Sequence, residues 1–386
     1  MKYSIYLVIL FFAFPANSFS QTTSSEADSL LAIQLQKEME QSQPVPPPTP
    51  QLRSAVSTNP DISAIADFRG IYNSEGKRNT DLYFKQLEMQ ISSVVDPFGR
   101  ADFLFSFGKD AANEEFGADL ETATYTTTSL PWQLQIVLGK FKPHFTKVNQ
   151  LHPHAFSFVE FPMMIKNYFG DEGLFMEGIS GSWLVPNPWD FYQELNVEVG
   201  RTLSGPTLAN GNKNNLLVIA HLKNFFDLTD NSTFELGFSG LSGPSGPDSL
   251  DHQVTMAGAD FTFKWKPIQF NTYQSFTWQN EIMTTKAKLA DDSNYNSIGA
   301  YSYMEYQIAK LWFVGAKYDY SNYGLEKDKT DKAISLLLRL QPTEFSIMAL
   351  EFQNNQKADK INGDSNYNQV TFRLIFGIGT HAAHSY

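Results

Sequence analysis

Residues 257–265 read AGADFTFKW. Five apolar positions alternate there with four small or polar ones: Ala257, Ala259, Phe261, Phe263 and Trp265 against Gly258, Asp260, Thr262 and Lys264. A period of two places alternate side chains on opposite faces of a β-strand. The stretch therefore predicts a strand with one face in apolar surroundings and the other face in water.

The same alternation recurs along the chain after Asp61. It is clearest in four further stretches: 87–92, 132–139, 194–199 and 370–378. Several runs extend over roughly nine to twelve residues, the length of a tilted transmembrane strand. A soluble β-sandwich is the alternative, but its strands average about five or six residues.

The connections between these runs predict the number of strands. Long polar connections lie at 73–80, 108–115, 141–174, 201–214, 241–252, 286–296, 321–331 and 353–367, and short ones at 96–99, 129–131, 186–188, 227–231, 267–268, 309–310 and 342–343. Outer-membrane barrels have even strand numbers, short periplasmic turns and longer outer loops. We therefore expect an all-β fold over 59–386, a 16-stranded antiparallel transmembrane β-barrel, with 73–80 and 353–367 outside the cell.

Composition excludes several classes of protein. Of the 386 residues 14% are aromatic and 18% charged, against about 25% charged in soluble domains, which argues against disorder. The formal net charge is -12 and no basic run occurs, so a nucleic-acid partner is not expected. The chain has no cysteine, which excludes disulfides, thiolate metal sites, catalytic thiols and a cysteine lipid anchor.

The N-terminal region divides into two segments before the barrel. Lys2, an apolar stretch over 5–14 and small residues near Ser20 predict a signal peptide over 1–20, with a retained anchor as the alternative. Residues 21–58 combine a short apolar stripe with a proline-rich spacer at 44–50. This segment predicts a periplasmic helical extension, in which a short coiled coil and a loosely ordered tail both stay open.

The connection 141–174 is by far the longest, and long loops in compact domains are usually functional. We expect it to fold into the lumen and to narrow it. The alternative is an outer lid or trimer latch with its own core of Phe156, Phe158, Phe161, Met163 and Met164. The candidate constriction residues are Lys140, Lys142, His144, Lys147, Glu160, Lys166, Asp171 and Glu172.

Charged residues on the polar faces of the strands are candidates for the lumen wall. They are Glu88, Glu194, Glu198, Asp260, Lys264, Lys317, Asp319, Arg339 and Arg373. This set mixes acids and bases rather than forming a ladder of one sign.

Histidines raise the question of a metal. His152 and His154 lie two residues apart in the longest connection, near several carboxylates, and imidazole with carboxylate suits zinc. His381 and His384 lie at the other end of the barrel and could form only a separate site. The alternative is a set of solvated histidines bonded to carbonyl groups, and no cofactor is otherwise expected.

Several short motifs resemble a group of Gram-negative, Bacteroidetes-type outer-membrane porins. They are Asn59-Pro60-Asp61-Ile62-Ser63, Asp119-Leu120-Glu121, Leu130-Pro131-Trp132, Gly139-Lys140-Phe141, Asn149 with His152 and His154, Asp171–Leu174, Ser182–Pro186 and the His381–His384 ending. More distantly, the chain is similar to the phosphate-selective porin O/P type. That resemblance implies a trimeric sixteen-stranded barrel with an N-terminal helical extension. Phosphate selectivity is not implied, because the lumen wall lacks the family's ladder of Arg and Lys.

Together these observations predict an outer-membrane porin for passive diffusion of small hydrophilic solutes or ions. The expected partners are outer-membrane lipid and lipopolysaccharide, the barrel assembly machinery and two further copies in a homotrimer. A zinc-linked porin and a closed structural or adhesive barrel are the alternatives. An enzyme is not expected, because no Gly-x-Ser-x-Gly elbow, phosphate loop or His-Glu-x-x-His motif occurs.

Overall fold

A computed structural model of the chain describes residues 60–74, 80–109, 116–203, 205–209, 215–246, 252–361 and 364–379. The expected signal peptide over 1–20, nearly all of the segment before the barrel, and His381 and His384 lie outside these residues. None of the described helices is long and apolar enough to cross a membrane.

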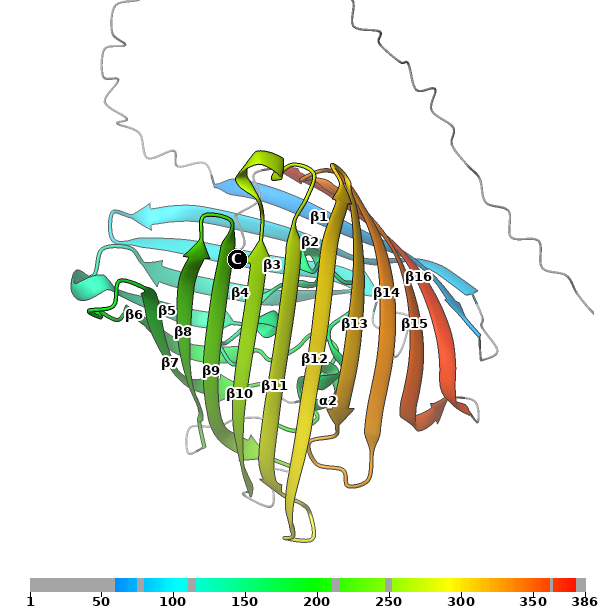
Figure 1. Cartoon of the computed structure of the whole chain (residues 1–386). Helices are drawn as coiled ribbons and strands as arrows, with labels where there is room; N and C mark the ends of the chain where they lie inside the picture. Colours follow the sequence, from blue (N-terminus) through cyan, green and yellow to red (C-terminus); the bar gives the residue numbers. More distant parts are fainter. Residues whose placement is uncertain are drawn as a thin grey trace, which may run out of the picture. The chain divides into compact units, whose positions relative to one another are not determined.

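Sixteen strands form one closed antiparallel barrel, which confirms the predicted fold (Figure 1). Each strand pairs with its neighbours in sequence, and β1 closes the ring against β16. The strands are β1 Asp61–Asn73, β2 Thr80–Asp96, β3 Gly99–Lys109, β4 Phe116–Thr127, β5 Leu134–Phe141, β6 Met176–Leu184, β7 Tyr192–Thr202, β8 Leu217–Thr229, β9 Ser232–Ser245, β10 His252–Trp265, β11 Phe276–Lys288, β12 Asn294–Ala309, β13 Trp312–Asn322, β14 Thr330–Thr343, β15 Ser346–Ile361 and β16 Asp364–Gly379.

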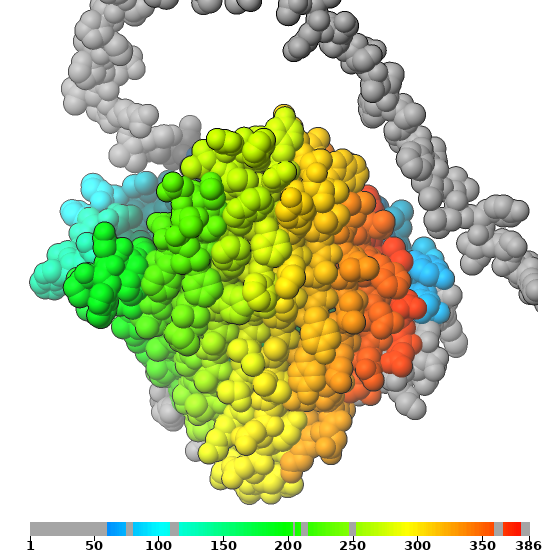
Figure 2. Space-filling view, viewed as in Figure 1, coloured from blue at the N-terminus to red at the C-terminus, as the bar shows by residue number. Residues whose placement is uncertain are grey.

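The barrel wall has its apolar side chains outside and its polar ones inside. In β14, Ile334 and Leu336 are each 57% exposed, whereas Ser335 is 1% exposed and Arg339 is 7% exposed. This inversion of the usual burial pattern suits a wall that faces hydrocarbon outside and a polar lumen inside. Figure 2 shows the continuous outer surface that β8 to β14 form.

An aromatic row runs across neighbouring strands on the outer surface. Phe226, Phe234, Phe261 and Trp278 follow one another in ring contact, with centroids 5.1 to 6.4 Å apart. These rings lie near the C-terminal ends of β8 and β10 and the start of β11. All of these positions are at the same end of the barrel, where residues 230–231 and 266–275 connect the strands. An aromatic girdle at a barrel rim is typical of a membrane–water interface.

The connections alternate less regularly in length than the sequence predicts. Residues 266–275, predicted as a short turn, include a 3-10 helix at Ile268–Phe270. At the opposite end, only residues 362–363 separate β15 from β16, although the sequence predicts a long connection over 353–367. Polar residues in both strands caused this error, because the strands pair through them as far as Gln356 and Asn366 and, after a register shift, again at Ile361 and Asp364.

The segment between β5 and β6, residues 142–175, lies inside the barrel and is called the lumen loop below. It contains two 3-10 helices, η2 Val148–Gln150 and η3 Pro153–Ala155, and the α-helix α2 Met163–Phe169 (Figure 1). Its apolar side chains share one buried cluster with inward residues of β8 to β12, β14 and β15, among them Ile219, Met256 and Tyr303. The loop thus has an apolar core of its own, but that core packs on the inner wall instead of outside the barrel.

A glycine in the wall makes room for α2, which contacts β12 and β13. A Cβ at Gly299 of β12 would lie 2.6 Å from Cβ of Met164, closer than such atoms approach. Only a residue without a side chain therefore allows α2 to reach this depth in the barrel.

Candidate functional site: the divided lumen

Barrel carboxylates hold the backbone of the lumen loop on one side of the lumen. The N–H groups of His144, Val148 and Met163 donate to Glu198, Glu281 and Asp319 at 2.9, 2.8 and 3.1 Å. Irregular backbone inside a membrane needs such partners, because it cannot bond to lipid. Several acids of the lumen wall therefore anchor the loop.

On the opposite side, the tip of the loop is held where β1 meets β16. Arg69 and Arg373 lie directly across from each other in the register, a destabilising arrangement for like charges. Asp67 accepts a 2.8 Å hydrogen bond from each guanidinium, and Glu160 of the loop pairs with Arg69. Arg373 also donates to the carbonyl groups of Pro153, Phe158 and Val159, at 2.8 to 3.3 Å.

Between the loop and the wall formed by β1, β2 and β4 lies a polar cavity of about 120 Å³. Arg69, Lys85, Lys142 and Lys166 supply four bases to its lining, and Glu121, Glu160, Asp171 and Glu172 supply four acids. Tyr83, Gln86, Pro153, Val159 and Phe161 complete the lining. The wall strands of this cavity, β1, β2 and β4, are different from the strands that share the apolar cluster.

Two β-bulges bring extra charges to this cavity. The register between β1 and β2 shifts at Lys85, and the register between β3 and β4 shifts at Glu121. A bulge adds one residue to a strand and can redirect its side chain. Both extra residues line the cavity, and at the first bulge two consecutive residues, Lys85 and Gln86, do so.

Ion pairs fix the charge state of the loop at the cavity. Burial alone would raise the pKa of Glu160, but the charges of Arg69 and Lys166 outweigh it and hold this pKa well below its usual range. The Glu160 carboxylate in turn raises the pKa of Lys166, whose Nζ lies 3.4 Å from both Glu160 and Asp171. Both groups are charged at neutral pH.

The candidate constriction residues separate into two sets in the structure. Five line the cavity: Lys142, Glu160, Lys166, Asp171 and Glu172. Three lie elsewhere: Lys140 pairs with Asp119 at 3.5 Å, His144 with Glu198 at 2.6 Å and Lys147 with Glu235 at 2.7 Å. The sequence alone did not show which of these residues line the cavity and which do not, because all eight belong to, or adjoin, the same long connection.

The candidate lumen-wall residues all lie on inward rows of the barrel: Glu88, Glu194, Glu198, Asp260, Lys264, Lys317, Asp319, Arg339 and Arg373. Several of them nevertheless form ion pairs with other inward-facing residues of the barrel. Arg339 pairs with Glu305 at 2.6 Å, and Lys317 pairs with Asp319 at 3.3 Å while its ammonium lies over the ring of Phe158.

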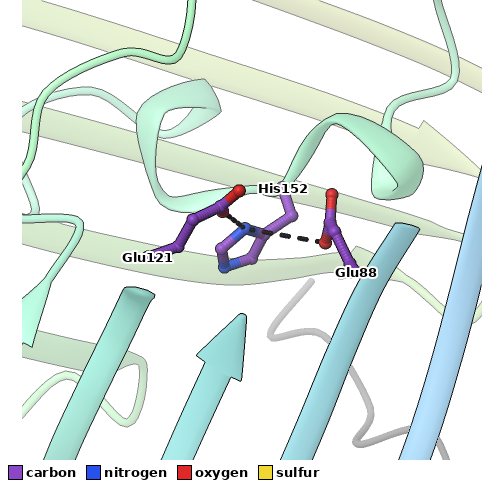
Figure 3. A group of neighbouring side chains, drawn as sticks. All are labelled: Glu88, Glu121 and His152. Carbon is purple, nitrogen blue, oxygen red and sulfur yellow. Dashed lines mark hydrogen bonds and ion pairs between the residues drawn. The ribbon is translucent and has the colours of Figure 1, made fainter. Parts of the chain in front are cut away.

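The two loop histidines meet carboxylates of the wall, not those near them in sequence. Nδ1 of His152 lies 3.1 Å from Glu121, and Nδ1 of His154 lies 2.7 Å from Glu88. Figure 3 shows the side chains of His152, Glu88 and Glu121 directed toward one another. Glu88 comes from β2 and Glu121 from β4, so the fold joins three distant segments here.

Sequence reasoning missed several residues of the site, chiefly Asp67, Arg69, Lys85, Glu121 and Glu281. Asp67 and Arg69 alternate with Ala66, Phe68 and Gly70, so period two in β1 could have found them. Lys85 and Glu121 lie where a bulge changes the phase of the alternation, and the sequence does not show the position of that change.

Comparison with known proteins bears on the fold. No family model matches the chain. An uncharacterized protein of Aquifex aeolicus (strain VF5) is 25% identical, over 85% of this chain and 80% of that protein.

Solved structures of outer-membrane proteins have the same architecture at low sequence identity. The outer membrane channel DcaP of Acinetobacter baumannii matches with a TM-score of 0.56 and 11% identity, over 83% of this chain and 98% of that one. An anion-selective porin from Comamonas acidovorans gives 0.55 and 11%, over 83% and 99%. OmpT of Vibrio cholerae, folded in vitro and described as a trimer form, gives 0.50 and 8%, over 83% and 99%. The chain therefore has the sixteen-stranded fold of outer-membrane porins.

Proposed function

We propose that this protein is an outer-membrane porin through which small hydrophilic solutes or ions diffuse passively. The solutes pass between the lumen loop and the wall formed by β1, β2 and β4. No bond is broken and no energy source is coupled to the flow.

One observation supports the proposal: the lumen loop has an apolar side packed on the barrel wall, called the dry cluster below, and a charged side that faces the cavity. Its apolar side chains pack on the wall of β8 to β12, while four bases and four acids surround the cavity on its other side. A narrow passage with fixed charges of both signs selects by size and by the local field. We accordingly propose a small-solute channel with weak charge preference, rather than a channel specific for phosphate.

Conductance of the full chain in a planar lipid bilayer tests the proposal. We expect discrete steps in potassium chloride and a reversal potential near zero in a salt gradient. A closed structural or adhesive barrel would insert without any steps, and that result would refute the channel.

The finer expectations belong to the same proposal. Outward apolar rows favour lipid and lipopolysaccharide as surroundings, and assembly by the machinery that inserts outer-membrane barrels. A homotrimer is supported by the trimer form described for OmpT of Vibrio cholerae. Membership of the Bacteroidetes-type group, the signal peptide over 1–20 and the periplasmic extension over 21–58 are proposed on the sequence motifs.

Orientation of the barrel is also proposed, with 73–80 outside the cell. The connection between β11 and β12 lies at the same end of the barrel and exposes Asp291 and Asp292. An epitope inserted between these two residues should be labelled on intact cells. Labelling only after the outer membrane is broken would reverse the orientation.

A further inference from the structure

We propose that the lumen binds one divalent transition-metal ion, with zinc as its best match, where η3 of the lumen loop meets β2 and β4. The ligands are Glu88, Glu121, His152 and His154. The metal site is independent of the channel proposal, whereas its effect on conductance rests on it.

The donor atoms already lie close enough for one ion. Nδ1 of His152 is 3.1 Å from Oε2 of Glu121 and 4.0 Å from Oε2 of Glu88. The same Glu88 oxygen is 2.7 Å from Nδ1 of His154. One ligand atom from each of Glu88, Glu121 and His152 fits within 4.8 Å (Figure 3). Zinc bonds of about 2.0–2.2 Å place neighbouring tetrahedral ligands roughly 3.4 Å apart, so small side-chain rotations suffice.

The fold holds these side chains in place. Glu88 is 2% exposed and Glu121 is 3% exposed, and Glu121 lies at the bulge of β4. The small Ser106 lies opposite Glu88 on β3, the strand between the two glutamates. Gln86 donates a hydrogen bond to Oε1 of Glu88, which leaves Oε2 for the ion.

The chemistry of the ligand set selects the metal. Two imidazoles and two carboxylates suit zinc and its neighbours, whereas calcium and magnesium prefer oxygen ligands alone. Two carboxylates also balance the charge of a divalent ion, so a bound ion leaves no net charge at the four ligands.

A bound ion would connect the loop to the wall beside the passage. His152 and His154 belong to the loop, whereas Glu88 and Glu121 belong to β2 and β4, so the ion acts as a cross-link. Glu121 also lines the charged cavity, and its neutralisation makes that cavity more positive. Zinc should therefore reduce cation flow and shift the reversal potential toward anions.

Calorimetric titration of zinc chloride into the tag-free full chain in detergent tests the site. We expect one ion per chain with a Kd below about 10 µM, and no binding of magnesium chloride under the same conditions. Glu121→Gln and His152→Asn should each weaken zinc binding at least tenfold.

His144→Asn is the matched control, because it removes another histidine–glutamate pair of the lumen that lies 2.6 Å apart. It should bind zinc like the native chain. Absence of zinc binding by the native chain, or equal binding by both ligand variants, would overturn the site. If the variants do not fold, anomalous diffraction at the zinc edge from the native protein decides: a peak outside the four ligands overturns the proposal, and a peak among them supports it.

A bilayer arm separates this inference from the proposed function. Zinc should lower the current of the native channel and leave the current of Glu121→Gln unchanged. If the protein binds zinc but never conducts, the channel is refuted and the metal site is supported. If it conducts but does not bind zinc, the metal site is refuted and the channel is supported.

Discussion

The lumen loop makes different contacts with the two sides of the barrel wall. Against β8 to β12 the loop presents buried side chains such as Val148 and Ile165, both 0% exposed, in a continuous apolar cluster. Against β1, β2 and β4 it presents Glu160 and Lys166, which line the polar cavity of about 120 Å³. On the first side the loop is stabilised by burial of its apolar side chains, and on the second side its charged side chains line the cavity.

In the proposed channel, this difference would let one loop be both a structural element and a filter. A solvated loop held only by exposed ion pairs would not be fixed in one position, because such pairs contribute little to stability. Burying large apolar side chains on one wall contributes roughly 1.5–3 kcal/mol for each. The apolar packing against β8 to β12 thus determines the position of the charged side chains that line the cavity. Variants can separate the contribution of apolar burial from that of the charges.

Neighbouring residues of α2 give the largest contrast. Ile165→Asp places an unpaired carboxylate in the dry cluster, at a cost of several kcal/mol. The loop should leave the wall, and single-channel conductance should rise severalfold. Lys166→Gln changes the next residue, which faces the cavity, and should alter conductance much less. Equal conductance in both variants would show that the dry cluster does not hold the loop.

The glycine behind α2 should give the next largest effect. Gly299→Val brings a Cβ to within 2.6 Å of Cβ of Met164, and overpacking of this kind costs about 1–3 kcal/mol. We expect a lower urea midpoint in detergent and noisier open-channel current. Gly240→Ala is the control, since a Cβ there has no neighbour within 4 Å. A native-like midpoint for Gly299→Val would contradict the close packing of α2.

Charge removal should distinguish lysines that line the cavity from one that does not. Lys142→Met combined with Lys166→Met should shift the reversal potential toward cations. Lys147→Met should leave it nearly unchanged, because Lys147 pairs with Glu235 outside the cavity and Lys223 stays beside that carboxylate. A larger shift for Lys147→Met would place the filter elsewhere in the lumen.

The smallest expected effect concerns pH. The pKa of Glu160 is held below its ordinary value of 4.5, so the contribution of its ion pairs is present at neutral pH and is lost only as the pH falls through that depressed pKa. The ratio of native conductance to that of Glu160→Gln should therefore be the same at pH 7 and at about pH 4.5. A ratio that moves about halfway to one at about pH 4.5 would mean that Glu160 titrates as an ordinary glutamate, which is half protonated at that pH.

These features could be predicted from the sequence to different degrees. Period two is a property of single strands, so the sixteen strands and the inward position of residues such as Asp260 and Arg373 could be derived. The dry side of the lumen loop could not, because its apolar set fits an outer lid equally well. The pairing of His152 with Glu121 is a contact between the lumen loop and β4, and such a contact leaves no periodic pattern in the sequence.

The central claim is that solutes pass between the loop and β2, and not through the dry half. The chain has no cysteine, so a single introduced thiol reports on one position without background. Tyr83→Cys places a thiol in the charged cavity, and Ile219→Cys places one in the dry cluster. A small positively charged methanethiosulfonate reagent, added during bilayer recording, should change the current of Tyr83→Cys in steps and leave that of Ile219→Cys constant. Stepwise modification of Ile219→Cys with no response from Tyr83→Cys would contradict the account.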